Sequence, residues 1–301
     1  MKCDKCNSPA VIHQRYSGMH LCKSHFKDDV ERKTKSVIRR YRMIEKNDTI
    51  AVALSGGKDS IVTLHILESL FGKRPDIQLT AILVDEGIKG YRAKTIKTAK
   101  EACKAIGIPL TIVSFVEKYG ATLDKMMEQG TGLTPCSLCG VFRRVLLNKT
   151  AKTLGATKVA TGHNLDDEAQ AVLLNLLRGD VDRLARLVPA RVQPGLIPRI
   201  KPLRNIPEKE VGLYALLDEL PVNFDECPYT GRSMRGEIRE MLNDFETKHP
   251  GTKYALMRSF EKMSETLRRE WMQADLRQCS ICGEPTTNTT CQACKLLEML
   301  S

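Results

Sequence analysis

The sequence predicts an α/β protein with a parallel sheet at its centre and a small metal-binding module at each end of the chain. Between residues 50 and 178, short apolar runs alternate with longer segments of helical periodicity, a pattern typical of successive βαβ units. Cysteines are paired at short spacing near both ends of the chain, as metal ligands on tight turns are. A chain of 301 residues with 42% hydrophobic content can bury one large core.

The alternating region resolves into four strand–helix pairs. Strands are expected at 50–54, 79–84, 110–115 and 158–161, and helices at 61–71, 93–106, 141–154 and 166–178. Ligands of parallel sheets bind beyond the carboxyl ends of the strands. Three loops, at residues 55–60, 85–87 and 162–164, should therefore converge on one crevice.

Two basic segments flank or interrupt this core. Residues 29–46 predict an amphipathic helix with arginines and lysines on its polar faces. Such a face is usually only solvated, but the net charge of the chain favours a nucleic-acid contact. Residues 183–207 contain five prolines, which prevent a regular helix. We expect an ordered basic loop there with a short strand near 197–200, followed by helices at 207–220, 233–247 and 252–277.

Net charge and hydropathy narrow the class of protein. A formal net charge of +11 and an isoelectric point near 9.1 indicate a polyanionic partner, for which nucleic acid is the natural candidate. The first residues contain no apolar signal region, and no apolar run reaches the ~18 residues of a membrane span. We therefore expect a soluble, cytoplasmic protein with no membrane partner. In a reducing compartment its eleven cysteines favour metal ligation over disulfides.

The terminal cysteines form two closed four-ligand sets. Their members are Cys3, Cys6, Cys22 and His25 at one end, and Cys279, Cys282, Cys291 and Cys294 at the other. Full coordination leaves no open position for catalysis, so both sets predict structural Zn²⁺ sites. Metal binding worth about 10–16 kcal/mol would supply the stability that these apolar-poor ends lack.

The segment Ser55-Gly56-Gly57-Lys58-Asp59-Ser60 lies between the first strand and its helix. Two glycines and a helix N-terminus there predict a phosphate cradle. An aspartate follows the lysine, so this is not a Walker A loop. The motif resembles the SGGxDS loop of the PP-loop ATP pyrophosphatases, which cut ATP between the α and β phosphates. That resemblance implies adenylation rather than transfer of the γ-phosphate.

A second polar cluster, Thr161–Glu168, begins at the end of the fourth strand. Carboxylates near a triphosphate usually hold Mg²⁺, so we expect Asp59 and one of Asp166 or Asp167 to be ligands. The alternative is an acidic helix N-terminus that serves capping alone. His163 is a base or a structural donor. We favour the structural role, because adenylation of a carbonyl oxygen removes no proton from that atom.

Three further cysteines, Cys136, Cys139 and Cys227, supply three thiolates and leave one position open. A [4Fe–4S] cluster with one free iron fits this count. A persulfide-carrying redox pair at Cys136 and Cys139, or a catalytic zinc with Cys227 as third ligand, fits it as well. The sequence does not separate these alternatives. Cys103 follows an apolar helix face and is expected to be a packing residue.

These motifs in combination, with Lys201-Pro202-Leu203-Arg204, resemble the tRNA 2-thiouridine synthetases over nearly the whole chain. The resemblance implies a PP-loop fold in four parts. These are an N-terminal zinc module (1–28), a basic linker helix (29–49), a catalytic domain (50–270) and a C-terminal zinc module (271–301).

The resemblance also implies a reaction. ATP adenylates the C2 oxygen of a tRNA uridine, at position 34 or 54, and sulfur carried on the open iron of the cluster replaces that oxygen. A ubiquitin-like carrier protein or inorganic sulfide supplies the sulfur, and a homodimer is possible in this family. Asp167 would act near the nucleotide and the base, and Asp59 on Mg²⁺. Ala53, Leu83, Arg143 and Gly162 would join the loop in binding ATP. Where the family often has a lysine after the CxxC pair, this chain has Arg143-Arg144, fixed cations that shuttle protons poorly.

Two other functions remain as alternatives. One is another PP-loop adenylating tRNA-modifying enzyme, such as a 2-thiocytidine synthetase. The other is a non-catalytic zinc-containing RNA-binding protein. The three additional cysteines disfavour the second alternative, because a pure binder has no use for an open metal position.

Overall fold

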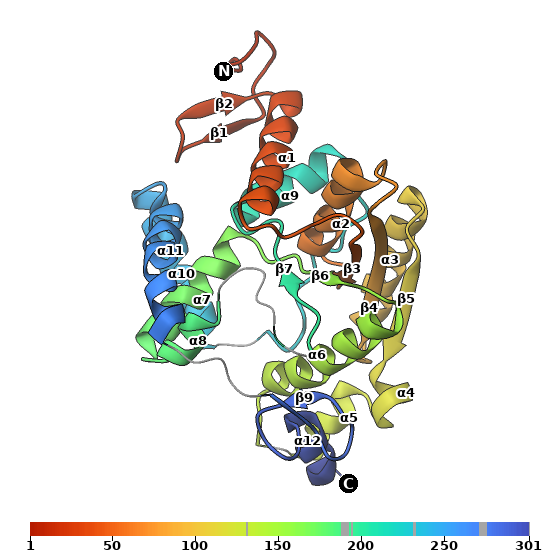
Figure 1. Ribbon diagram of the computed structural model, residues 1–301. Coiled ribbons are helices and arrows are strands. Elements are labelled where there is room, and N and C mark those ends of the chain that lie inside the picture. Colours follow the sequence, from red (N-terminus) through yellow and green to blue (C-terminus); the bar gives the residue numbers. More distant parts are fainter. Residues whose placement is uncertain (131, 188–192, 194, 231–232, 271–275, 301) are drawn as a thin grey trace.

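The computed structural model describes residues 1–130, 132–187, 193, 195–230, 233–270 and 276–300 (Figure 1). Its centre is a five-stranded parallel sheet in the order β5-β4-β3-β6-β7. The strands are β3 (Thr49–Leu54), β4 (Gln78–Asp85), β5 (Leu110–Ser114), β6 (Lys158–Ala160) and β7 (Arg199–Ile200). The predicted α/β fold with a parallel sheet is confirmed. Strand order reverses between β3 and β6, and ligands of open α/β sheets bind at such a switch point.

The β3 strand is the middle of the sheet and pairs on both sides. Its Leu54 lies opposite Leu83 of β4, and its Ala51 lies opposite Val159 of β6. Both faces of this strand are covered, which explains why its sequence is almost continuously apolar. The carboxyl ends of β3, β4 and β6 therefore open on one side of the sheet.

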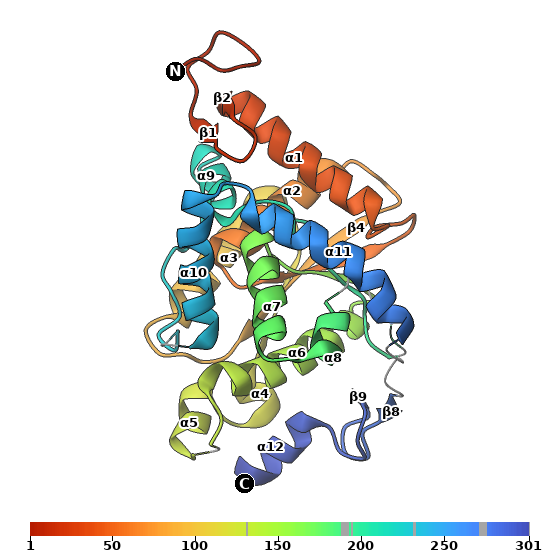
Figure 2. The same ribbon diagram turned by 90° about the vertical axis from the view of Figure 1, so that its left-hand side faces the viewer.

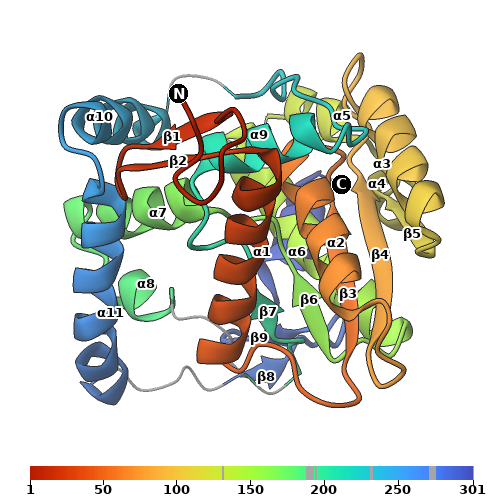
Figure 3. The ribbon, with the colours of Figure 1, turned by 90° about the horizontal axis from the view of Figure 1, so that it is seen from above.

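Helices cover both faces of the sheet (Figures 1 and 3). On one face, α2 (Lys58–Phe71) and α3 (Arg92–Ile106) pack on Ile50, Val52 and Leu83. The other face is covered by α6 (Pro135–Thr153), with the short helices α4 (Phe115–Tyr119) and α5 (Leu123–Glu128) beside it. Phe115 and Phe142 are fully buried in this second layer and meet edge to face.

A further group of helices stands beside the sheet (Figure 2). It comprises α7 (Leu165–Leu177), α8 (Val181–Ala185), α10 (Met234–Lys248) and α11 (Thr252–Glu270). Phe260 is buried at its centre, together with Leu165 and Leu242. Because α7 begins shortly after β6 ends, the core of this helix group extends to the carboxyl end of the sheet.

The two terminal modules lie at opposite ends of the molecule (Figure 1). The first is the hairpin of β1 (Ile12–Gln14) and β2 (Met19–Leu21), which leads into α1 (Lys23–Arg40) and packs near α9 (Glu208–Leu217). The second contains β8 (Arg277–Gln278), β9 (Pro285–Thr286) and α12 (Gln292–Leu300), which packs against α6. Over the described ranges, no helix combines the length and apolar character that crossing a membrane requires.

Some predicted boundaries are wrong for local reasons. The helix predicted at 29–46 starts at Lys23 and ends at Arg40, because Arg42 has a φ of +47° that a right-handed helix does not admit. The helix predicted at 141–154 begins at Pro135, after Thr134 caps it by accepting from the Ser137 amide. The last predicted helix, 252–277, ends at Glu270 as described, and residues 271–275 lie outside the described residues.

The start of the proline-rich segment is helical, although its prolines predict a loop. The helix α8 extends to Ala185, into the region expected to be a loop. The short strand expected near 197–200 is present as β7. Residues 188–192 and 194 of this segment lie outside the described residues.

Candidate active site

The loop after β3 is shaped by two close approaches of backbone. Gly56 has a φ of +84°, and a Cβ placed there would lie 2.2 Å from the carbonyl oxygen of Thr95, so only glycine fits. Gly57 is the N-cap of α2. The Oγ of Ser55 accepts from the Gly57 amide at 3.3 Å and lies 3.2 Å from the Oγ of Ser60. The loop is thus fixed by its own side chains, with the N-terminus of α2 open to an anion.

The end of β6 lies directly against this loop. A Cβ on Gly162 would come within 2.7 Å of the backbone of Asp59. Two residues later, Asn164 Nδ2 donates to Asp59 Oδ1 at 2.9 Å. The sequence places Gly162 in the nucleotide site, and the structure brings it into contact with the first turn of α2.

Lys58 lies between two carboxylates. Its Nζ is 3.0 Å from Asp59 Oδ2 and 2.8 Å from Glu208 Oε1. Burial acts to lower the pKa of Lys58, but Asp59 and Glu208 together raise it above its usual value. The ammonium group therefore stays charged at the mouth of the loop. Glu208, the first residue of α9, is absent from the sequence prediction because no local pattern marks it.

The carboxyl groups of Asp59 and Asp167 lie close enough to interact electrostatically. Burial raises the pKa of both, and the charge of Asp167 further raises the pKa of Asp59. Asp167 lies 3.0 Å from Arg235 Nη2 and completes a capping box with Asn164. Two mutually repelling, half-buried carboxylates fit a divalent cation, which would relieve both the desolvation and the repulsion.

Asp166 has different surroundings from its neighbour. It is buried, pairs with Lys253 of α11, and accepts from the Glu208 amide at 2.8 Å. These contacts use both of its carboxylate oxygens within the protein. Asp167 also uses both oxygens within the protein, with Arg235 and with the Asn164 amide, but its side chain is 32% exposed, so of the two aspartates it is the one that a cation can reach.

Two residues that the sequence analysis did not single out connect the loop to the cysteine pair. Arg92 is 5% exposed, and its Nη1 donates to the Ser55 carbonyl at 2.9 Å. Its Nε lies 2.8 Å from Glu86 Oε2. The other oxygen of Glu86 lies 3.9 Å from the Sγ of Cys139 and 3.8 Å from Arg143 Nη1. A continuous polar chain thus runs from the phosphate loop to Cys139.

The segment that carries Cys227 is attached to the same loop. The amide of Asn223 donates to the Gly56 carbonyl at 3.1 Å, and Asn223 forms a parallel bridge with Gly57. Beyond it, the Sγ of Cys136 lies 3.9 Å from the carbonyl oxygen of Tyr229. Cys227 and Cys139 pack against the same core cluster. The three cysteines, which are far apart in sequence, therefore gather beside the loop.

The spacing of these three sulfurs differs from that of the terminal sets. Within the described residues, Cys136, Cys139 and Cys227 do not form a group whose ligand atoms all lie within 4.8 Å. A tetrahedral zinc with Zn–S bonds of about 2.3 Å holds its sulfurs about 3.8 Å apart. A cluster that bonds each thiolate to a separate iron holds them farther apart, so the spacing favours the cluster over a zinc. Burial raises the pKa of Cys139 to about 11, which leaves the metal-free thiol a poor nucleophile.

The terminal sets have the spacing that zinc requires. The ligand atoms of Cys3, Cys6, Cys22 and His25 all lie within 4.8 Å of one another, as do those of Cys279, Cys282, Cys291 and Cys294. The Cys6 and Cys22 sulfurs are 3.7 Å apart, and those of Cys282 and Cys291 are 3.6 Å apart. Disulfide sulfurs are bonded at about 2.05 Å, so all these cysteines are free thiols. Both sets fit a tetrahedral ion without rearrangement.

A basic cavity of about 720 Å³ adjoins the crevice, and Thr161 and His163 form part of its wall. Burial, with repulsion from Arg144 and Arg143, lowers the pKa of Arg199 to about 10. The ring of His163 hydrogen-bonds Thr161 at 2.8 Å, and burial together with Lys201 lowers its pKa to about 4. His163 is therefore neutral near pH 7, and the cavity offers cations that repel one another.

Three predicted nucleotide contacts, Leu83, Ala53 and Arg143, differ in their burial. Leu83 is fully buried in the core cluster that contains Leu54, so its side chain does not face the crevice. Ala53 is half-buried near the end of β3. Arg143 is exposed on α6, one turn beyond Cys139. Cys103 is buried in α3, and burial raises its pKa to about 11, as a packing residue requires.

Comparison with known proteins identifies the family. The PP-loop domain family matches residues 26–245, and the N-terminal LIM domain of 2-thiouridine synthetase TtuA matches residues 2–27. The tRNA 2-thiolation protein NcsA of Haloferax volcanii is 41% identical over 100% of this chain and 99% of its own. The tRNA-5-methyluridine(54) 2-sulfurtransferase of Pyrococcus horikoshii is 38% identical over 98% of this chain and 93% of its own.

Among solved structures, the U34-tRNA thiolase NcsA from Methanococcus maripaludis, with its [4Fe-4S] cluster, superposes with a TM-score of 0.87. It is 38% identical and is matched over 99% of this chain and 96% of its own. These similarities extend over both terminal modules and the sheet. The resemblance to the 2-thiouridine synthetases that the motifs indicate is confirmed. The chain therefore belongs to the PP-loop enzymes, and within them to the family of tRNA 2-thiolation sulfurtransferases.

Proposed function

We propose that this chain uses ATP to adenylate the C2 oxygen of a tRNA uridine and then replaces that oxygen with sulfur to give 2-thiouridine. One observation carries the proposal: the three additional cysteines gather beside the phosphate loop and are connected to it through Arg92, Glu86 and Asn223. An enzyme that activates a base and then delivers sulfur to it requires these two sites side by side. The names of the relatives, which are tRNA thiolases and sulfurtransferases, support the same reaction.

In the first step the loop binds the β- and γ-phosphates of ATP. The N-terminus of α2 and the ammonium of Lys58 stabilise the charge that develops on pyrophosphate as it leaves. Asp59 and Asp167 would hold the Mg²⁺ that accompanies the triphosphate. The C2 oxygen of the uridine attacks the α-phosphorus, the bond to the bridging oxygen of pyrophosphate breaks, and an adenylated base results.

The second step exchanges oxygen for sulfur at C2. A sulfur nucleophile attacks that carbon, and the C2–O bond breaks with release of AMP. Adenylation makes this possible, because a phosphorylated oxygen leaves far more readily than an oxide. His163, neutral and bonded to Thr161, orients the wall of the crevice and carries no proton in either step.

Cys136, Cys139 and Cys227 would hold a [4Fe–4S] cluster. Their wide spacing and the single position left open by three thiolates fit this group better than a zinc ion. When bound, the cluster would supply an iron on which sulfur can be carried. Arg143 beside Cys139 would offset the negative charge of the thiolates, whereas Glu86, at 3.9 Å from the Cys139 sulfur, adds to that charge.

The remaining assignments concern the partners and the modules. The cavity cations Arg144, Arg199 and Lys201 would hold the RNA strand beside the target base.

We assign zinc to both terminal sets. We also propose that the four parts of the chain meet at residues 28, 49 and 270. A ubiquitin-like carrier protein or sulfide as donor, and a homodimer, stay predictions. A cytoplasmic location is supported by relatives such as the cytoplasmic tRNA 2-thiolation protein 1 of Caenorhabditis elegans.

Anaerobic purification followed by iron, zinc and acid-labile sulfide analysis tests the metal assignment. We expect two zinc ions and four each of iron and sulfide per chain. Incubation with ATP, Mg²⁺, sulfide and unmodified tRNA should give AMP and 2-thiouridine in equal amounts, and mass spectrometry of tRNA fragments would place the modified uridine. AMP formation that does not depend on tRNA, with no thiolated nucleoside, would contradict the proposed reaction.

A further inference from the structure

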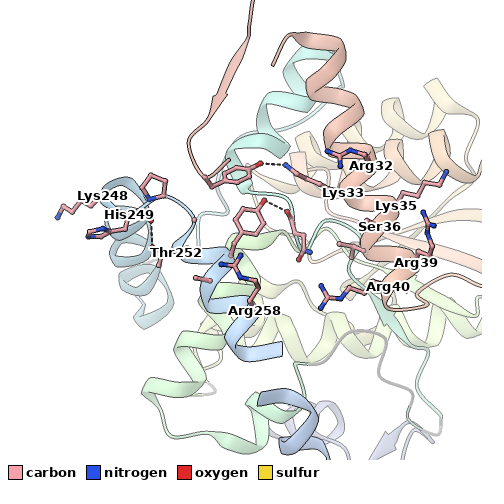
Figure 4. Close-up of a pocket in the computed structure, with 17 residues that line it drawn as sticks. Arg32, Lys33, Lys35, Ser36, Arg39, Arg40, Lys248, His249, Thr252 and Arg258 are labelled. Atoms are coloured by element: carbon pink, nitrogen blue, oxygen red, sulfur yellow. Dashed lines mark hydrogen bonds between the residues drawn. The ribbon is translucent and has the colours of Figure 1, made fainter. Parts of the chain in front are cut away.

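A second groove lies between α1 and the junction of α10 with α11 (Figure 4). Its volume is about 1020 Å³. One wall is formed by α1, from Arg32 to Arg40, and the other by residues 248–258. None of its lining residues belongs to the phosphate loop, to the three-cysteine site or to the cavity beside His163. The groove is therefore separate from the catalytic crevice.

The charge of this groove has one sign. Among the described residues that line it, every ionisable side chain except those of the two tyrosines is basic. These are Arg32, Lys33, Lys35, Arg39, Arg40, Lys248, His249 and Arg258. The carboxylates that pair with some of them, such as Asp29 and Glu261, are not part of the lining. A concave surface with cations on both walls concentrates anions.

Several of these cations are not engaged within the protein. Arg40 pairs with Glu261 at 3.1 Å and Lys248 with Asp244 at 2.7 Å. In contrast, the exposed side chains of Lys35, Arg39 and Arg258 have no described ionic or hydrogen-bonding partner. These three cations can therefore bind an anion from outside the chain.

We propose that this groove binds the sugar–phosphate backbone of the tRNA at a second place, outside the catalytic crevice. The inference rests on the proposed function, which makes tRNA the substrate. Arg32, Lys35 and Arg39 on α1 are three and four positions apart, so they are separated by about 4.5–6 Å along the helix axis. A row of cations at this spacing can contact consecutive phosphates of one strand. The groove would thus fix the orientation of the tRNA without reading its bases.

The lining distinguishes RNA from an acidic protein or a membrane. Stable protein interfaces have an apolar centre, and membrane-bound helices insert apolar side chains. Of the exposed large apolar side chains in the described chain, none lines this groove. The tyrosine hydroxyls in it are already engaged, that of Tyr16 with Glu210 at 2.6 Å and that of Tyr254 with the Asn205 carbonyl at 2.9 Å. Charge without an apolar anchor fits a polyanion backbone.

The test compares two variants with equal changes of charge. The groove variant carries Lys35→Glu, Arg39→Glu and Arg258→Glu. The control carries Lys97→Glu, Lys100→Glu and Lys104→Glu on α3, which lies away from α11 in Figures 1 and 3. Affinity for unmodified full-length tRNA is measured by fluorescence anisotropy as a function of NaCl concentration. The KM for tRNA and the kcat of AMP formation are measured in parallel.

We expect the groove variant to lose affinity, with the slope of log Kobs against log[salt] reduced by about 2–3, because three contacts each contribute about 0.7–0.9. The KM for tRNA should rise while kcat at saturating tRNA stays unchanged. Gln substitutions at the same three positions remove the contacts without adding negative charge and should reduce the slope equally. This second variant keeps the test valid if the charge-reversed protein does not fold.

Three results would overturn the inference. If the groove variant matches the α3 control in affinity and slope, the groove is only a solvated surface. If it binds tRNA normally but loses sulfur transfer from an acidic carrier protein, the groove binds protein and not RNA. If wild type and control fail to bind tRNA at all, the proposed function fails and this inference fails with it.

Discussion

Asn164 Nδ2 donates to Asp59 Oδ1 at 2.9 Å, and Asn164 Oδ1 accepts from the Asp167 amide at 3.0 Å. One side chain thus joins the first turn of α2 to the first turn of α7 across the boundary between β3 and β6. Both carboxylates proposed to hold Mg²⁺ are positioned by it. Asn164 itself is 2% exposed, so its two contacts are shielded from competing water.

Two substitutions separate the capping role of Asn164 from its contact with Asp59. Asn164→Ala should lower the free energy of unfolding by about 0.5–2 kcal/mol, because the N-cap of α7 is lost. Asn164→Asp keeps the cap but places a carboxylate against Asp59. It should therefore lose AMP formation by more than about tenfold, which corresponds to 1.4 kcal/mol of barrier. Its loss of stability comes from repulsion between two carboxylates, so it should diminish as pH falls, unlike the loss in Asn164→Ala. Wild-type AMP formation by Asn164→Asp would show that the contact with Asp59 has no role.

The ion pairs of Lys58 predict that loss of its ammonium group abolishes AMP formation, whereas loss of its carboxylate partner Glu208 does not. Lys58→Ala should abolish AMP formation, because the cation that stabilises departing pyrophosphate is gone, while both zinc ions stay bound. Glu208→Gln removes a carboxylate that holds Lys58 at 2.8 Å but leaves the ammonium in place. It should keep AMP formation within a few fold. Radiolabelled ATP with unmodified tRNA measures both, and wild-type rates for Lys58→Ala would remove the loop from the mechanism.

The raised pKa of Asp59 predicts opposite pH effects on activity and stability. AMP formation should fall as pH drops through the raised pKa, because the protonated carboxyl no longer binds Mg²⁺. The folded state binds this proton more tightly than the unfolded chain does. The ionised group therefore opposes folding of the metal-free protein above its folded pKa, and this penalty disappears as pH falls.

Asp59→Asn should accordingly raise the melting temperature of the metal-free protein at pH 7 and abolish AMP formation. The gain in melting temperature should shrink in a series of buffers of decreasing pH. A lower melting temperature at pH 7 would mean that the contact with Lys58 outweighs burial, and that the pKa of Asp59 is not raised.

The three clustered cysteines should behave as one unit. Cys136→Ser, Cys139→Ser and Cys227→Ser should each lose the broad iron–sulfur absorbance and fail to produce 2-thiouridine, because two thiolates hold a cluster poorly. AMP formation should persist, since the phosphate loop is intact. Cys103→Ser is the control, because it changes a buried packing residue of α3. Full thiolation by anaerobically reconstituted Cys227→Ser would favour a persulfide relay confined to Cys136 and Cys139.

The C-terminal module should stabilise the helix that carries two of these cysteines. Glu284 Oε2 in the module accepts from the side-chain Nδ2 of Asn148 on α6 at 2.7 Å, and both residues are buried. Cys291→Ser should remove one zinc ion and speed amide hydrogen exchange in α6. Cys22→Ser should remove the other zinc ion and leave exchange in α6 unchanged. Equal exchange in both variants would show that the docking of the module does not depend on its metal.

The sequence predicts those parts of the site whose signals are local. Glycines at a strand end, short cysteine spacings and apolar periodicity each reflect a conformation that neighbouring residues decide. The start of α6 had such a signal too, since Thr134 and Pro135 are a favourable N-cap and N1 pair. That signal outweighs Gly140 in the helix interior, so Cys136 and Cys139 lie on helical turns.

The ion-pair partners could not be predicted in this way. Glu86 lies in the 85–87 loop that the sequence places at this edge of the sheet, but its partner Arg92 has ordinary neighbours in the sequence, and so do Glu208 and Arg235. Their roles depend on strand order, because only the pairing of β3 with both β4 and β6 brings these segments together. A charged residue in a loop gives no indication of its partner until the topology is known.

The bridge between Gly57 and Asn223 sets a covalent limit on the geometry of catalysis. Cys227 follows Asn223 by four residues, and four residues span at most about 14 Å even when fully extended. The third thiolate therefore cannot move farther than this tether allows from the loop that binds pyrophosphate, provided the bridge holds. Loosening of the core can disorder the segment between them, but it cannot lengthen it. An insertion of a few residues between Asn223 and Cys227 is the change that would separate the two half-reactions while leaving each site complete.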